Sequence, residues 1–214
     1  SFSGFNIVSA HTDSPCFKVK WNPEVKAAGF PIRLNVEAYG GMIMQSWFDR
    51  PLSIAGRVFI KRNGKVEEKL VNLGQKFTIV IPNLAIHQNR EANNGWKISV
   101  QKEMLPIFSD GESSFLDEVA SSAECRKEDL LDYDLFLYNK TAPVFWGAEG
   151  EFFSSPKIDD LGCAWTALEA LKTSEPKDKI AMCALFDNEE TGSGTKQGAL
   201  SDFLLSVTER IMEN

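Results

Sequence analysis

The pattern of hydrophobic and polar residues divides the chain into a strand-rich first part and a last part in which strands and helices alternate. Residues 5–8 form a short apolar run that predicts a buried strand, with His11 at its carboxyl end. Apolar residues alternate with lysines over residues 17–21, which predicts a half-exposed strand. Short strand-like runs continue to about residue 83, and Asn63-Gly64 is a hairpin signal between two of them.

The pattern changes in the last part of the chain. After Asp159-Asp160, apolar residues recur at helical spacing from residue 161 to residue 171, so a helix is expected to begin directly after the two acidic residues. Residues 179–186 then form a continuous apolar run, which is typical of a strand buried on both faces of a parallel sheet. A second amphipathic helix is predicted over residues 200–211.

These elements predict an α/β domain that is interrupted by a second domain. The α/β domain comprises residues 1–20 and 150–214, and a β-rich domain of residues 21–149 is inserted between its two segments. The chain lacks an initiator methionine, a strand-like run begins at Phe2, and residues 206–214 stop inside a helical pattern. We therefore expect both ends to be cuts, with the α/β domain incomplete at its C-terminus.

The composition and net charge limit the kinds of binding partner that we expect for this chain. The chain carries 23 Lys and Arg against 30 Asp and Glu, a net charge of -7, and no basic stripe that could neutralise phosphates. Nucleic acid and anionic membranes are therefore not expected as partners. No apolar run approaches the roughly 20 residues of a bilayer span, and residues 1–14 do not resemble a secretory signal, so we expect a cytoplasmic protein.

The four cysteines lie far apart in the sequence and show no CxxC spacing. A chain of 214 residues can bury a core without a disulfide framework. We therefore expect buried thiols at Cys16, Cys125, Cys163 and Cys183.

Three short motifs contain side chains that bind divalent cations. They occupy residues 11–13, 159–160 and 187–190, each at the end of a predicted strand or the start of a predicted helix. In open α/β sheets, ligands gather beyond the carboxyl ends of the strands, so the three motifs are expected to converge. Singly, each has an ordinary structural explanation: a packed histidine, a helix cap or a solvated acidic pair. Together, in this order, they predict a metal site.

Spacing and chemistry assign a role to each residue of this site. Residues i and i+2 share a face of an extended segment, so Asp13 can orient the imidazole of His11, which is the metal ligand. Two metal ions about 3.5 to 4 Å apart need a bridging carboxylate, and Asp159 at a helix start is the candidate. Of the two adjacent glutamates, Glu190 is expected to bind metal and Glu189 to accept a proton from the attacking water.

Longer segments around these motifs carry a further signal. In chain order they are SAHTDSP (9–15), YGG (39–41), WFDRPLS (47–53), IHQNR (86–90), SPKIDDL (155–161) and FDNEETGS (186–193). These segments resemble the signature segments of aspartyl aminopeptidases, a family of dinuclear zinc exopeptidases. They follow the family order through nearly the whole chain, which is more specific than any one motif.

The resemblance implies a zinc exopeptidase that removes N-terminal Asp or Glu from peptide substrates. It implies an α/β fold, in which a mixed-sheet catalytic domain contains an inserted β-rich dimerisation domain, and self-association through dimers into a tetrahedral dodecamer. Carried over residue by residue, it makes His11, Asp159 and Glu190 ligands of two zinc ions, Asp13 the orienting partner and Glu189 the general base.

The resemblance also implies contributions from outside this set. His87 matches a family histidine that reaches from the inserted domain into a neighbouring subunit's site, where it could contact the substrate or the developing oxyanion. The family supplies two further ligands, an Asp and a His, from a region that would follow Asn214, and this chain contains no histidine beyond His87. The fragment alone is therefore expected to be inactive.

Two other interpretations stay open at this point. The same dinuclear site would also suit a neighbouring peptidase or deacylase family with different substrates, and hydrolysis rates on peptides that begin with Asp or Glu, against Leu or Ala, would separate the two. Alternatively, the chain is a truncated, non-catalytic relative that acts as an assembly or interaction protein. The presence or absence of bindable zinc would decide this second question.

Overall fold

The computed structural model describes residues 2–213, which form two compact units. One unit comprises Ser1–Pro15 and Pro143–Asn214, and the other comprises Cys16–Ala142. The sequence placed both boundaries a few residues later, after residue 20 and before residue 150. The first boundary moves because the strand that begins at Cys16 pairs from its first residue with a strand of the second unit. Alternation of apolar residues predicts such a strand but not the sheet that it joins.

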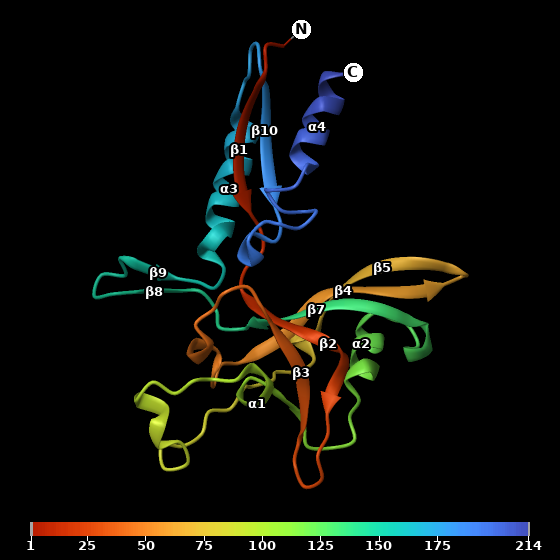
Figure 1. The fold of residues 1–214 in the computed structure, drawn as a ribbon, viewed down its shortest axis with the longest axis vertical. Coiled ribbons are helices and arrows are strands. Elements are labelled where there is room, and N and C mark those ends of the chain that lie inside the picture. The colour runs from red at the N-terminus through yellow and green to blue at the C-terminus, as the bar shows by residue number, and fades with distance from the viewer. Residues whose placement is uncertain (1, 214) are drawn as a thin grey trace. The chain divides into compact units, whose positions relative to one another are not determined.

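The second unit is built on a six-stranded sheet in the order β5-β4-β7-β2-β3-β6, shown in Figure 1. Neighbouring strands are antiparallel throughout. The strands are β2 (Cys16–Val25), β3 (Ile32–Tyr39), β4 (Leu52–Arg62), β5 (Lys65–Asn72), β6 (Ile107–Ser109) and β7 (Leu130–Asn139). β4 and β5 are joined at Asn63-Gly64, and both residues have positive φ (51° and 75°), as a type I′ hairpin turn requires. The predicted hairpin is therefore confirmed.

The hydrophobic core lies in this second unit. Alternate residues of β4 and β7 are fully buried on one face of the sheet, among them Ile54, Val58 and Leu135. Helix α2 (Phe115–Ser122) adds Phe115 and Val119 to the same cluster. Because this burial removes large aliphatic and aromatic side chains from water, it is the main source of stability in the unit.

The shorter elements connect these strands or follow them. They are α1 (Val100–Glu103) and the 3-10 turns η1 (Met44–Trp47), η2 (Leu73–Gln75), η3 (Arg90–Asn93), η4 (Lys127–Asp129) and η5 (Glu189–Thr191). Of these, only η5 belongs to the first unit.

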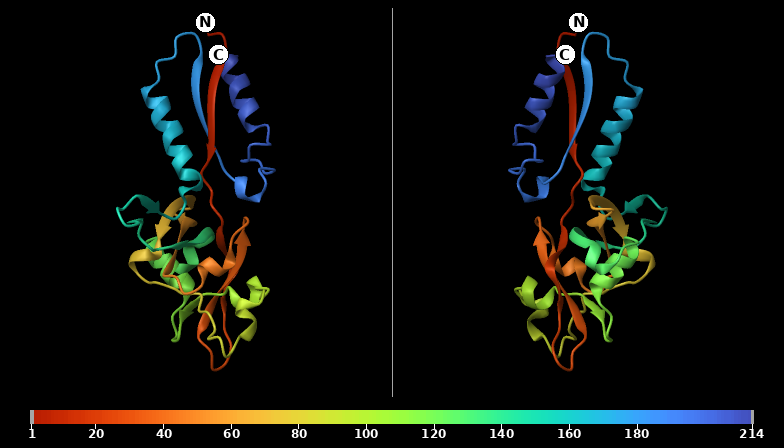
Figure 2. Two further views of the ribbon diagram at one scale, coloured as in Figure 1. Left: turned by 90° about the vertical axis from the view of Figure 1, so that its left-hand side faces the viewer. Right: turned by 90° about the vertical axis from the view of Figure 1, so that its right-hand side faces the viewer.

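The first unit contains a parallel pair of strands with a helix on either side. β1 (Phe5–His11) pairs with β10 (Ile180–Phe186) without interruption, from Phe5 opposite Ile180 to His11 opposite Phe186. In Figure 2, α3 (Ile158–Thr173) and α4 (Phe203–Met212) lie on opposite sides of this pair. The predicted alternation of strands and helices is confirmed in this part of the chain. Because the strands are parallel, their carboxyl ends meet at one place.

The burial expected for these two strands is not observed. Ile7 and Val8 of β1 are 44% and 51% exposed, and the sheet that β1 and β10 form has two strands. Two strands leave two open edges, so an apolar sequence that suits a central strand stays partly in contact with water. The expectation of fully buried strands is therefore wrong for this chain.

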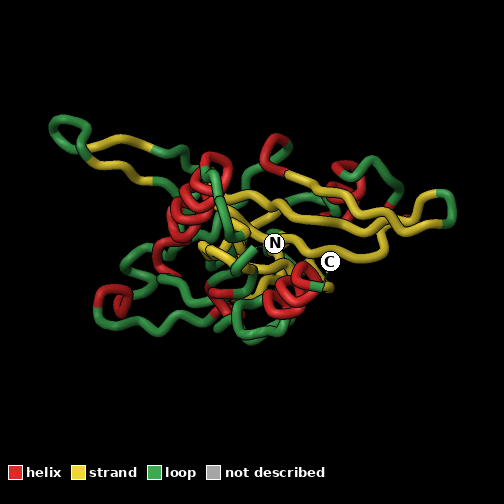
Figure 3. Tube along the Cα trace, turned by 90° about the horizontal axis from the view of Figure 1, so that it is seen from above, coloured by secondary structure: helices red, strands yellow, loops and turns green. Residues whose placement is uncertain are grey.

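A hairpin of β8 (Val144–Trp146) and β9 (Phe152–Ser154) precedes α3. It forms the arm at the upper left of Figure 3. Phe145 contacts Phe153 across the hairpin, with ring centroids 5.0 Å apart, and both rings are largely exposed. Among the described residues, no helix is both long enough and apolar enough to cross a bilayer.

The uneven distribution of the core leads to a prediction for hydrogen exchange of this 214-residue chain. Every buried hydrophobic residue in the described part of the chain except Ala164 and Ala167 belongs to the second unit. Backbone amides of β4 and β7 should therefore exchange on the order of 100-fold more slowly than those of β1 and β10. Mass spectrometry of peptic fragments would measure the difference. Equal protection of the two sheets would contradict the prediction.

Candidate metal centre

The candidate site forms where β1 and β10 end side by side. His11 is the last residue of β1, and the next residue, Thr12, donates its backbone N–H to the carbonyl oxygen of Phe186 at 3.0 Å. Beyond Phe186 the chain turns at Asn188, which has a left-handed φ of 60°, and enters η5. The strand pairing therefore brings residues 11–13 next to residues 187–190, as the position of these motifs at strand ends predicted.

The carboxylate of Asp13 connects the two strand ends. Its Oδ1 lies 3.2 Å from Nδ1 of His11 and accepts a hydrogen bond from the backbone N–H of Glu189 at 3.2 Å, while its Oδ2 accepts one from the backbone N–H of Glu190 at 3.1 Å. The side chain is only 6% exposed, so these hydrogen bonds are shielded from competing water. A carboxylate at Nδ1 favours the tautomer with its proton on that nitrogen, which leaves Nε2 free to bind a metal ion.

Several carboxylate oxygens lie around Nε2 of His11. Asp159 Oδ1 is 3.3 Å away, Glu189 Oε2 is 3.8 Å away and Asp160 Oδ2 is 3.9 Å away. His11, Glu189 and Glu190 also offer ligand atoms that all lie within 4.8 Å of one another. The structure therefore brings together His11, Asp159, Glu189 and Glu190. Glu189, the predicted base, therefore also lies within reach of a cation bound to His11.

His87 lies elsewhere in the chain. It belongs to the second unit, in a turn between Ile81 and η3 in which Gln88 N–H donates to the carbonyl of Ala85 at 2.8 Å, and its side chain is exposed. The metal-binding group found in the described chain does not contain it. The role of His87 stays a prediction.

The electrostatics of the site are those of a negative cluster around one imidazole. Burial by itself lowers the pKa of His11, but the charges of Asp13, Asp160 and Glu189 together raise it above its ordinary value. Burial and the neighbouring charge of Glu189 raise the pKa of Glu190. Bringing these carboxylates together therefore carries an electrostatic cost in the absence of a cation.

The side chains fit a zinc ion. Within residues 2–213, the ion pairs of Asp159, Asp160 and Glu189 are all with His11, so no lysine or arginine balances their charge. Imidazole nitrogen and carboxylate oxygen are ligands that Zn²⁺ prefers. The donor set and its uncompensated charge are therefore suited to a divalent cation.

Asp160 is the residue at this site that the sequence analysis did not assign. Neither Asp159 nor Asp160 has helical dihedral angles, so regular helix in α3 begins after Asp160, as predicted. The two neighbouring side chains differ sharply, because that of Asp159 is 88% exposed whereas that of Asp160 is 15% exposed. The available signal was its position before a helix, where Asp is a common N-cap.

Asp160 accepts a hydrogen bond from the backbone N–H of His11 at 3.1 Å, and its carboxylate lies close to the thiol and the backbone N–H of Cys163. The thiol and the N–H groups lower the pKa of the Asp160 carboxyl. Cys163 is exposed, so the expectation of a buried thiol is wrong for this residue, and the other three cysteines are only half-buried.

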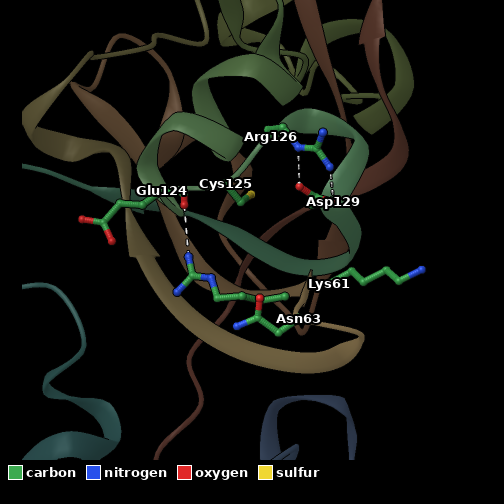
Figure 4. A pocket seen from close by; sticks show the side chains of 7 residues that line it. Lys61, Asn63, Glu124, Cys125, Arg126 and Asp129 are labelled. Atoms are coloured by element: carbon green, nitrogen blue, oxygen red, sulfur yellow. Dashed lines mark hydrogen bonds and ion pairs between the residues drawn. The ribbon is translucent and has the colours of Figure 1, made fainter.

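A separate polar pocket lies in the second unit (Figure 4). It is lined by Lys61, Arg62, Asn63, Glu124, Cys125, Arg126 and Asp129. Arg126 forms two hydrogen bonds with Asp129, at 2.7 and 3.0 Å, and Arg62 donates to the carbonyl oxygen of Glu124 at 3.1 Å. Both guanidinium groups thus have protein partners, and their hydrogen bonds stabilise the turn at residues 124–129.

The contact between His11 and Asp13 predicts a titration that NMR can follow. In the metal-free protein, the pKa of His11 should lie above 6.5, and Asp13→Asn should lower it by removing a charge and a hydrogen-bond acceptor. Stability contributed by the protonated imidazole is present below pH 6.5 and is lost as the pH rises through the raised pKa. His87, the only other histidine, is the internal control. An unchanged His11 curve in the variant would contradict the assignment.

The chain resembles known proteins over its whole length. The family described as aminopeptidase I zinc metalloprotease (M18) matches residues 1–214. A protein named probable M18 family aminopeptidase 2 from Clostridium acetobutylicum is 43% identical over 217 residues, which cover 98% of this chain and 50% of that protein. The chain thus spans about half the length of the curated relatives that it matches.

Solved structures agree with this similarity. The mApe1 dodecamer of S. cerevisiae matches with a TM-score of 0.82 and 26% identity, over 98% of this chain and 49% of that one. An M18 family aminopeptidase from Thermotoga maritima matches with a TM-score of 0.79 and 26% identity, over 98% of this chain and 48% of that one. The predicted α/β fold class is confirmed by these matches.

Proposed function

The chain belongs to the aminopeptidase I (M18) family of zinc metalloproteases, and from this membership we propose that the protein is a dinuclear-zinc aminopeptidase that removes N-terminal Asp or Glu from peptides. The observation that carries the proposal is the meeting of His11, Asp159, Glu189 and Glu190 at the carboxyl ends of β1 and β10. Carboxyl ends of parallel strands are where open α/β folds place their ligands.

Three residues of this chain would hold the zinc ions. We assign His11 and Glu190 as ligands and Asp159 as the bridge, because Asp159 Oδ1 is the carboxylate oxygen nearest to Nε2 of His11. Bound zinc would polarise the scissile carbonyl and lower the pKa of the attacking water. Since the relatives are about twice as long as this chain, we propose that the remaining ligands, an Asp and a His, lie outside it. The fragment alone would then be inactive.

Glu189 is proposed as the general base. Its side chain is 54% exposed, and its Oε2 lies 3.8 Å from Nε2 of His11. The carboxylate can therefore reach both the metal ligand His11 and an incoming water molecule. It would accept a proton from the attacking water and deliver this proton to the leaving amine. Asp13 would hold the imidazole and the backbone of Glu189 in place during both transfers.

Self-association is proposed to complete the site. One structural relative is described as a dodecamer, and we propose that this protein also assembles from many copies. His87 is exposed on the second unit, so it is available to a neighbouring copy, where it could contact the substrate or the developing oxyanion. We also propose a cytoplasmic location and no nucleic-acid or membrane partner, in line with the net charge of -7.

The role of Glu189 can be tested in the intact natural protein. Glu189→Gln should lower kcat by roughly 100- to 10,000-fold, because the amide cannot accept the proton, while zinc content stays unchanged. Glu169→Gln is the matched control, since Glu169 contacts Lys172 on the surface of α3 and should retain full activity. Normal turnover by Glu189→Gln would contradict the assignment.

Substrate preference distinguishes this proposal from a related peptidase. Hydrolysis of peptides that begin with Asp or Glu should exceed that of otherwise identical peptides with Leu or Ala by at least about 100-fold in kcat/KM, because a site that pairs a charged side chain discriminates strongly. A preference for Leu or Ala would place the protein among peptidases of different specificity. Failure of the intact protein to bind zinc would instead indicate a non-catalytic relative.

A further inference from the structure

We propose that Asp160 is a positioning residue of the metal centre: its carboxylate joins the end of β1 to the start of α3 and thereby holds His11 and Asp159 in place for a shared zinc ion. This inference rests on the proposed metalloprotease function. It assigns to Asp160 a role different from that of its neighbour Asp159, although the two residues are identical in type and adjacent in sequence.

One edge of β1 pairs with β10, and the other edge is open in the described chain. In a strand, successive backbone N–H groups point to opposite edges. The N–H of Thr12 points to β10, where it donates to Phe186, so the N–H of His11 points to the other edge. The acceptor for this N–H is Oδ2 of Asp160, at 3.1 Å. A half-buried N–H without a partner would cost about 1 to 3 kcal/mol, so this bond fixes the position of His11.

The first N–H groups of a helix have no partner within it, and the residue before α3, Lys157, provides no side-chain cap. Asp160 is the last residue before the regular helical dihedral angles of α3, which is the N-cap position, and the proximity of its carboxylate to Cys163, three residues further on, lowers its pKa. One carboxylate therefore contacts both the last residue of β1 and the first regular turn of α3.

The position of Asp159 depends on that of Asp160. The side chain of Asp159 is 88% exposed, yet its Oδ1 lies 3.3 Å from Nε2 of His11. Its backbone is directly bonded to that of Asp160, so the hydrogen bonds of Asp160 set the position from which Asp159 reaches the imidazole. Ser14 contributes a weaker tie, because its hydroxyl donates to the carbonyl oxygen of Asp159 at 3.5 Å.

Zinc affinity of the intact natural protein is the direct test, measured by competition with a chelating dye. Asp160→Asn keeps the size and the N-cap preference of the side chain but removes its charge and one acceptor. We expect a 10- to 100-fold weaker zinc affinity, the range that follows loss of a residue that orients a ligand, with unchanged stoichiometry. Asp178→Asn is the matched control, because Asp178 accepts from Ser3 at the opposite end of the strand pair, and it should bind zinc normally.

A second variant separates position from charge and from folding. Asp160→Glu retains the charge but displaces the carboxylate by one methylene, so a positioning role predicts weakened binding, whereas a purely electrostatic role predicts affinity like that of the natural protein. Circular dichroism and the Tm of the metal-free variants show whether α3 is retained. The visible spectrum of the Co²⁺-loaded protein should change in both variants, because cobalt bands report the ligand geometry.

The outcomes distinguish this inference from the proposed function. If the unsubstituted protein binds no zinc, the proposed function fails. If it binds zinc and both Asp160 variants bind within about threefold of it, the inference about Asp160 alone is wrong. Loss of a whole equivalent of zinc in Asp160→Asn would make Asp160 a direct ligand and would equally overturn the positioning role.

Discussion

The arrangement of the site depends on one buried carboxylate. The Asp13 carboxylate contacts the imidazole of His11 and accepts hydrogen bonds from the backbone N–H groups of Glu189 and Glu190. It therefore joins the segments that follow the two strands. Without these hydrogen bonds, the charges of the two glutamates would favour a separation of the segments. The negative carboxylate of Asp13 thus holds two glutamates nearby by accepting hydrogen bonds from their backbone N–H groups. The side-chain carboxylates of these glutamates stay available to a cation.

Packing and chemistry are divided between the two units. The second unit holds nearly all of the buried hydrophobic residues, whereas within residues 2–213 the unit that contains the site contributes only Ala164 and Ala167 to them. The site is therefore organised by strand pairing and by backbone hydrogen bonds to the carboxylates of Asp13 and Asp160 rather than by a core of its own. Hydrogen bonds to ionised groups are directional, which suits the placement of metal ligands.

Much of this arrangement could be predicted from the sequence, because it follows from local patterns. The apolar run 179–186 and the position of His11 after another apolar run gave the two strands, and parallel pairing then made their ends meet. Asp160 could not be separated from Asp159 in this way, because the backbone angles at residues 159–160 decide which carboxylate turns inward. Likewise, the exposure of Ile7 depends on how many strands flank β1, which no pattern within β1 records.

The uninterrupted ladder between β1 and β10 has a consequence for changes in chain length. His11 faces Phe186 because the two strands pair over seven successive residues and neither strand contains a bulge. Deletion of a single residue inside β10 would reverse the faces of all residues beyond it and turn Glu189 and Glu190 away from the imidazole. The loop that joins α3 to the start of β10 can lengthen or shorten without this effect. Evolution and protein engineering are thus free to vary the segment near residue 176, but not the strand that follows it.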